Sequence, residues 1–72
     1  MGEFLLYADG VLFGGIYDDR LLVKKTDDNA EFGMSEALPY EGAKPMYLVD
    51  EVDDRERVKE IIERTVEGLN LS

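Results

Sequence analysis

Cysteine and histidine are both absent from the sequence. Without cysteine the chain can form no disulfide framework, no thiolate nucleophile and no cysteine-ligated zinc site. Without histidine it lacks the commonest general base and the commonest transition-metal ligand. Long apolar runs are also missing, and no basic stretch followed by an apolar stretch opens the chain, so we expect neither a membrane partner nor a secretory signal. These absences favour a cytoplasmic domain.

Positive charge is scarce as well. Lysine and arginine total 8 against 17 aspartates and glutamates, which gives a net charge of −9. Proteins that hold nucleic acid by its phosphates need a local surplus of cations, because that contact supplies most of the non-specific affinity. The basic clusters are Lys24-Lys25 and the group Arg55, Arg57 and Lys59, which is interleaved with glutamates. We therefore expect no direct binding to nucleic acid.

The length of 72 residues allows one domain with a thin core. A hydrophobic fraction of 44% is too high for a disordered chain, even at this net charge. We treat residues 1–72 as a single folded domain.

The first 25 residues predict three antiparallel strands. In residues 4–8 we expect alternate residues, Leu6 among them, to face one side of the sheet and Tyr7 the other. Asp9-Gly10 is a strong signal for a two-residue hairpin turn, in which both central residues need a positive φ. In residues 11–17 we expect Phe13 and Tyr17 to share a face. Gly14-Gly15 interrupts this strand and predicts a bulge, a bend or a close approach of another backbone.

The rest of the chain predicts helices and two further strands. Residues 26–33 read as a short helix, capped by Thr26 or Asp27 and ended by Gly33. Strands are expected at residues 37–40 and 46–49. A C-terminal helix is predicted with Asp53 as its N-cap and with one apolar stripe: Val58, Ile61, Ile62, Val66 and Leu69. The predicted fold is α+β, a two-layer antiparallel sheet of about five strands in the order β-β-β-α-β-β-α.

Four carboxylates, Asp50, Glu51, Asp53 and Asp54, form the densest polar group. Such a group can bind Mg²⁺ or Ca²⁺ or supply an acid/base pair, which leaves a metal-dependent hydrolase as an alternative. We favour the interpretation that these acids precede a helix, whose positive N-terminal end stabilises them. No nucleophile is accompanied by a base. We therefore expect no catalytic residue, no bound metal, no cofactor and no enzymatic activity.

Four tyrosines are candidates for an interaction surface: Tyr7, Tyr17, Tyr40 and Tyr47. Tyrosine on a half-exposed strand is also a common packing residue, so an aromatic surface and ordinary packing both remain open.

Three stretches carry a resemblance to a known family: MGEFLLY at residues 1–7, LFGGIYDDRLLVK at 12–24 and LPYEGAKPM at 38–46. Followed by the VDEVD step at 49–53 into an acidic helix, they make residues 1–68 resemble the N-terminal domain of the TfoX/Sxy family, regulators of competence for DNA uptake. The resemblance implies a two-layer α+β fold and a regulatory role through a protein partner, such as a transcription factor or a polymerase. It implies no catalytic residues.

The chain departs from that family in two ways. The family's helix before the first strand is missing, so we expect an N-terminally truncated domain, and the family's C-terminal helical domain is missing too. An uncovered sheet face of roughly 400 Å² would contribute about 10 kcal/mol on burial before ordering costs. We therefore expect a homodimer. A small chaperone or adaptor that binds an extended peptide is the alternative to the regulatory module.

Overall fold

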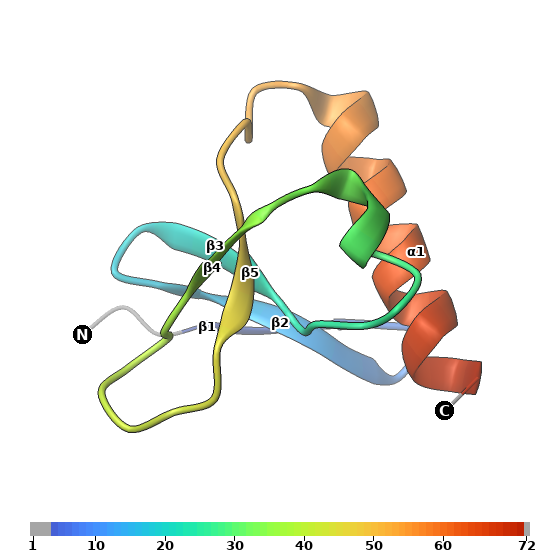
Figure 1. Cartoon of the computed structure of the whole chain (residues 1–72). Helices are drawn as coiled ribbons and strands as arrows, with labels where there is room; N and C mark the ends of the chain where they lie inside the picture. The colour runs from blue at the N-terminus through green and yellow to red at the C-terminus, as the bar shows by residue number, and fades with distance from the viewer. Residues whose placement is uncertain (1–3, 72) are drawn as a thin grey trace.

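The computed structural model describes residues 4–71, with side chains for residues 4–70. One five-stranded sheet carries one long helix on a single face (Figure 1). The strands lie in the order β1-β2-β3-β5-β4, and every neighbouring pair is antiparallel. Their bounds are β1 (Phe4–Ala8), β2 (Val11–Tyr17), β3 (Arg20–Val23), β4 (Ser35–Ala37) and β5 (Met46–Val49). The helix α1 spans Arg55–Leu71, and a short 3₁₀ helix, η1, spans Ala30–Phe32. The predicted α+β class is confirmed.

Two tight turns connect the first three strands. Asp9 and Gly10 have φ values of 51° and 78°, as the hairpin signal predicts. Asp18 and Asp19, between β2 and β3, also have positive φ values, of 52° and 62°. Aspartate tolerates this left-handed region better than most residues that carry a Cβ atom, which suits the pair to the turn.

A bulge in β2 explains the glycine pair. Leu6 pairs with Gly14 while Tyr7 pairs with Leu12, so Phe13 is the extra residue on β2. A Cβ atom on Gly14 would collide with the carbonyl oxygen of Leu22, because β3 approaches closely there. Both the predicted bulge and the predicted close approach are therefore present.

The bulge also corrects a prediction. Phe13 points toward α1 and belongs to the core, whereas Tyr17 lies on the opposite face of the sheet. The expected sharing of one face by Phe13 and Tyr17 is wrong, because one inserted residue reverses the alternation of the strand.

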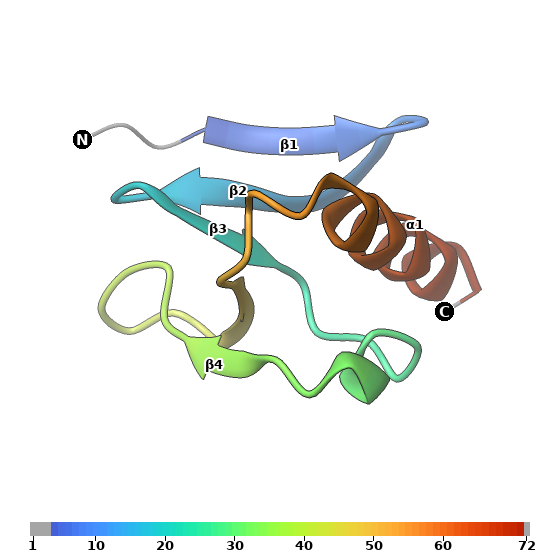
Figure 2. The same cartoon turned by 90° about the horizontal axis from the view of Figure 1, so that it is seen from above.

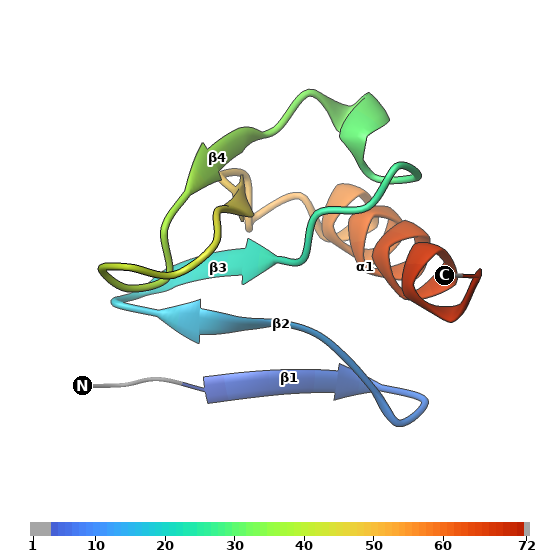
Figure 3. The ribbon, with the colours of Figure 1, turned by 60° about the horizontal axis from the view of Figure 1, so that its bottom comes forward.

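The core lies between α1 and one face of the sheet. Its buried members come from β2, β3, β5 and α1: Phe13, Val23, Val49, Ile61 and Val66. Figures 2 and 3 show α1 beside the sheet, with β1 at the outer edge. Paired residues of antiparallel strands point to the same face. We call the face turned away from α1 the open face; its side chains include Leu5, Tyr7, Leu12, Tyr17 and Leu22.

The segment after β3 differs from its prediction. The short helix expected over residues 26–33 is present only as the three-residue 3₁₀ helix η1, and the residues before it form turns. Thr26 and Asn29 still make a reciprocal cap: the Asn29 N–H donates to Thr26 Oγ1 at 3.1 Å, and the Thr26 N–H donates to Asn29 Oδ1 at 2.9 Å. Gly33 ends η1 with a φ of 67°, as expected.

Asn29 ties this segment to α1. Its side-chain amide donates to the carbonyl of Lys24 at 2.7 Å and to Thr65 Oγ1 at 2.8 Å. Thr65 in turn donates to the carbonyl of Ile61 at 2.7 Å. Asn29 and Thr65 are fully buried. Gly68 lets the segment approach, because a Cβ atom there would lie 2.8 Å from the side chain of Thr26.

Two element boundaries move relative to the sequence predictions. The strand expected at residues 37–40 ends at Ala37 instead, and Pro39, which lacks an N–H donor, follows it. The N-cap of α1 is Asp54 rather than Asp53, because Asp54 Oδ1 accepts the N–H of Arg57 at 3.1 Å. No helix in residues 4–71 is long and apolar enough to cross a membrane.

Candidate functional site

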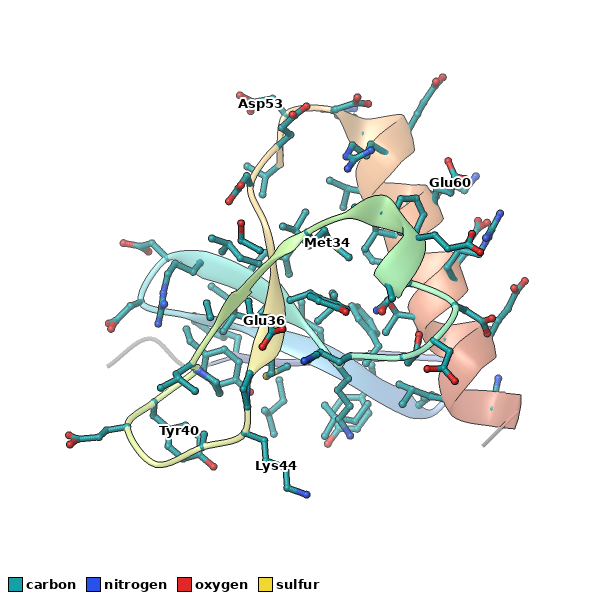
Figure 4. All side chains as sticks on the ribbon, viewed as in Figure 1. Met34, Glu36, Tyr40, Lys44, Asp53 and Glu60 are labelled. Atoms are coloured by element: carbon teal, nitrogen blue, oxygen red, sulfur yellow. The ribbon has the colours of Figure 1, made fainter. Side chains whose placement is uncertain are left out.

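The described chain has a cleft of about 780 Å³ on the open face. The loop between β4 and β5, residues 38–45, makes one wall together with Met46 of β5, and Leu12, Tyr17, Lys24 and Lys25 also line the cleft. Tyr40 and Lys44 both extend from this loop in Figure 4. We call this concavity the loop cleft. Its lining combines residues of β2 and β5 with residues of the loop and of the segment that follows β3.

Arg20 anchors the loop to the sheet. Its Nη2 atom donates to the carbonyl of Leu38 at 3.1 Å, and its Nε atom donates to the carbonyl of Tyr17 at 3.3 Å. Within the loop, the N–H of Ala43 donates to the carbonyl of Tyr40 at 3.2 Å. Arg20 therefore fixes the loop at the point where it leaves β4, and this loop is one wall of the cleft.

The charge of the loop cleft is opposite to that of the whole chain. Lys24, Lys25 and Lys44 line it, and no acidic residue does. Lys25 pairs with Glu36 at 3.1 Å and lies over the ring of Tyr47, 5.4 Å from the ring centre. Three of the eight basic residues of an acidic chain thus meet at one concavity. The Lys24-Lys25 pair is visible in the sequence, but the presence of Lys44 at the same cleft is not. It depends on the path of the loop between β4 and β5 in the folded chain.

An exposed apolar edge borders this surface. Phe4, Leu5 and Tyr7 are 61%, 54% and 60% exposed. All three lie on β1, which has no strand on its outer side among residues 4–71 (Figure 3). Tyr7 pairs across the sheet with Leu12, a residue of the loop cleft. Leu5 and Tyr7 therefore adjoin the cleft on the open face, whereas Phe4, which pairs with Ile16, points to the face of α1.

The four candidate tyrosines do not all reach this surface. Tyr17 and Tyr40 line the loop cleft, where Tyr17 is nearly buried and Tyr40 is 62% exposed. Tyr7 adjoins the cleft through Leu12. Tyr47 pairs with Val23 and packs against the core, so it lies on the face of α1.

The acidic group before α1 does not assemble into a site in the described residues. Asp50, Glu51, Asp53 and Asp54 are all exposed. Nowhere in residues 4–71 do three carboxylates come together as metal ligands. Asp54 instead caps the helix, as the favoured interpretation of the acids requires. Figure 4 places Asp53 at the opposite end of the molecule from the loop with Tyr40 and Lys44.

Comparison with known proteins adds one relative. The chain is 34% identical over 71 residues to an uncharacterized 12.7 kDa protein in the trpE 5′ region of Spirochaeta aurantia. The match covers 94% of this chain and 62% of that protein, so the chain spans less than two thirds of the relative's length. No family model matches the chain. No solved structure matches it significantly.

Proposed function

We propose that the protein is a non-enzymatic interaction module that binds a protein partner through the open face and the edge of β1. One observation carries the proposal: three large apolar side chains are exposed on a free edge strand, and two of them, Leu5 and Tyr7, lie on the same face as the cleft. Folded proteins normally protect such edges with charge, proline or a covering element. Residues 4–8 of β1 carry no charge and no proline. An edge of this kind suits addition of a strand or packing of an apolar partner.

A regulatory role is proposed from the sequence resemblance. Two of the three stretches that resemble the TfoX/Sxy N-terminal domain, residues 12–24 and 38–46, supply nearly all of the loop cleft. The motif residues therefore meet at one surface, although they are separate in the sequence. We assign this surface to a partner such as a transcription factor or a polymerase, in keeping with a net charge of −9 that disfavours direct contact with DNA.

Site-specific photo-crosslinking tests this proposal. A photoreactive amino acid replaces Tyr7, and a control carries it at Val52, which is 54% exposed but lies in the turn before α1. We expect one defined partner to crosslink at position 7 and not at position 52. The purified partner should then bind the unmodified protein and lose binding to Tyr7→Glu. Equal crosslinking at both positions would contradict the proposal.

A peptide-binding adaptor is the second candidate, and the free edge of β1 favours it. Strand addition gives affinity through main-chain hydrogen bonds, so an adaptor would accept an extended segment. The crosslinked residues distinguish the two roles. A segment that is extended or unfolded in the free partner indicates an adaptor, whereas the surface of a folded transcription factor or polymerase indicates a regulator.

We also propose that, in the absence of the partner, the free edge of β1 pairs with that of a second copy to form a homodimer, so the second copy and the partner compete for this edge. Antiparallel pairing of two β1 strands around Leu6 would place Leu5 of one copy beside Tyr7 of the other, and such aliphatic–aromatic pairs stabilise sheets. Sedimentation at tens of micromolar should then show a particle heavier than the 8.2 kDa chain. Leu5→Lys should reduce it to the monomer, and the control Val52→Lys should not. A monomeric wild-type protein would overturn the dimer without touching the crosslinking result.

A further inference from the structure

We propose that the loop cleft receives an acidic, extended segment of the partner protein, with an apolar or aromatic side chain placed between Tyr17 and Tyr40. This inference rests on the proposed function and names the chemistry of the ligand. The occupant is identified by charge complementarity. Lys24, Lys25 and Lys44 are among the residues that line the cleft, and although Lys25 is paired with Glu36, Lys24 and Lys44 give it positive charge in a chain whose overall charge is strongly negative.

The lysines are not equivalent. Lys25 already has Glu36 and the ring of Tyr47 as partners. The ion pairs of the described residues leave Lys24 and Lys44 unpaired, and these two come from different segments of the chain, one after β3 and one in the loop. Two ammonium groups that line one cleft can contact carboxylates of a single chain that binds there.

The remaining lining is apolar and aromatic. Leu12, Met46 and the two prolines of the loop surround the tyrosines. A tyrosine ring can pack against an apolar side chain, and the exposed Tyr40 can do so while its hydroxyl group stays in contact with water. The combination therefore fits alternating acidic and apolar side chains, a pattern that an extended segment presents to opposite sides.

The cleft opens toward the rest of the open face. Leu12 belongs to the cleft and pairs with Tyr7 on β1, so a segment can leave the cleft and stay in contact with exposed apolar surface. A small anion would use the lysines but would leave that surface untouched. This continuity is why we assign a polypeptide rather than a free phosphate or nucleotide.

Fluorescence anisotropy with a defined probe tests the inference. The probe is a short labelled peptide in which aspartate and glutamate alternate with leucine and tyrosine, and a second peptide has lysine in place of each acid. In roughly physiological salt, where charges more than about 8 Å apart are screened, the long-range repulsion from the acidic chain is reduced. We expect the acidic peptide to bind the wild-type protein with a Kd below about 1 mM. The basic peptide should not bind in the cleft.

Matched variants localise the binding. Lys24→Gln with Lys44→Gln removes the two unpaired cleft charges, and Arg55→Gln with Lys59→Gln removes two exposed charges from α1. Surface charge pairs are modest, so we expect each cleft lysine to change the Kd roughly two- to fivefold and the pair roughly four- to 25-fold. The α1 pair should change it less than twofold. Tyr40→Ala should weaken binding independently of charge. Circular dichroism confirms that each variant is folded.

Four outcomes overturn the inference. The first is that the acidic peptide does not bind the wild-type protein, and the second is that the cleft and α1 variants lose peptide affinity equally. The third is that inorganic phosphate or ATP competes fully with the peptide. The fourth is that the cleft variants lose self-association while their affinity for the peptide is unchanged. The third result would identify a small anion as the ligand, and the fourth a second copy of the chain. A defined crosslink at position 7 together with any of these results would leave the interaction module standing and remove only the acidic ligand.

Discussion

Replacing Asn29 with alanine should destabilise the protein more than its place in an irregular segment suggests. The side chain is fully buried and makes three hydrogen bonds, to the N–H of Thr26, the carbonyl of Lys24 and the hydroxyl of Thr65. No buried side-chain polar atom in the described residues lacks a partner. Asn29→Ala removes all three bonds and leaves the Thr26 N–H without its side-chain acceptor.

The magnitude follows from these contacts. Each bond contributes about 0.5–1.5 kcal/mol, and a buried group left without a partner costs about 1–3 kcal/mol. We therefore expect a loss of about 2–5 kcal/mol in the free energy of unfolding. A domain of this length is typically stable by about 4–11 kcal/mol, so the loss is a large share of the total. The melting temperature should fall by about 10 °C or more.

Urea denaturation followed by circular dichroism measures the effect, with two companion variants. Asn70→Ala makes the same chemical change at an exposed position of α1 and should alter stability by less than about 0.5 kcal/mol. Thr65→Val keeps the shape of the side chain but removes one partner of Asn29, and should cost about 1–2 kcal/mol. The Thr65→Val variant still gives a measurable change in the free energy of unfolding if Asn29→Ala does not fold. An Asn29→Ala protein as stable as Asn70→Ala would refute the role of this network.

Two other substitutions examine the sheet and the helix cap. Gly14→Ala should lower the free energy of unfolding by about 2–3 kcal/mol or prevent folding, because the new Cβ atom would meet the backbone of Leu22 and Val23. Gly10→Ala should lower it by only about 1 kcal/mol, since the φ of 78° is unfavourable for alanine but no atom lies within 4 Å of the new Cβ. Chemical denaturation of the two variants measures the difference. Asp54→Ala should lower stability by about 1 kcal/mol, because the N–H of Arg57 loses its side-chain acceptor. Asp53→Ala should lower stability by less than half of that. Thermal melting of the two variants identifies the N-cap, and equal shifts in melting temperature would contradict its assignment to Asp54.

Four of the five strands and the C-terminal helix were predictable because their signals are local, whereas the strand expected at residues 37–40 shares only Ala37 with β4. The Asp9-Gly10 turn needs a positive φ at both residues, and the apolar stripe of α1 repeats at the period of a helix. The faces of β2 were only half predictable. Gly14-Gly15 indicates an irregularity, but which residue is inserted depends on the register with β1, and that register decides the face of Tyr17.

The segment from Thr26 to Gly33 shows why a helical signal can mislead. Its cap, its acids and its terminal glycine are all consistent with a helix, and Thr26 and Gly33 do act as expected. The side chain of Asn29 instead bonds to Lys24 and Thr65, a partner 36 residues away, and these contacts hold the segment as turns against α1. A long-range hydrogen bond of this kind has no local signature.

The loop cleft was not predictable, although each of its residues was visible in the sequence. Lys24 and Lys44 look isolated until the loop from β4 to β5 brings them to one concavity. Arg20 makes that arrangement, since it joins the carbonyl of Leu38 to the turn after β2. Neither the charge of Arg20 nor its place beside Asp19 indicates which carbonyl it will bind.

The loop that forms the wall of the cleft also contributes to the stability of the fold. Removing the loop would therefore affect ligand binding and folding together. Leu22 is fully buried although it lies on the face opposite α1, so the helix cannot be what covers it. On that face the ring of Tyr17 lies over Gly15, the residue paired with Leu22, and Tyr17 lines the same cleft as the loop held by Arg20. Deleting the loop would remove the binding wall and expose apolar surface of Tyr17 at the same time, with a loss of about 25 cal/mol for each Å² of apolar area uncovered. Substitutions at the tips of Lys24, Tyr40 and Lys44 change the chemistry of the cleft and leave that cover in place, and for this reason they can distinguish a lost ligand from a lost fold.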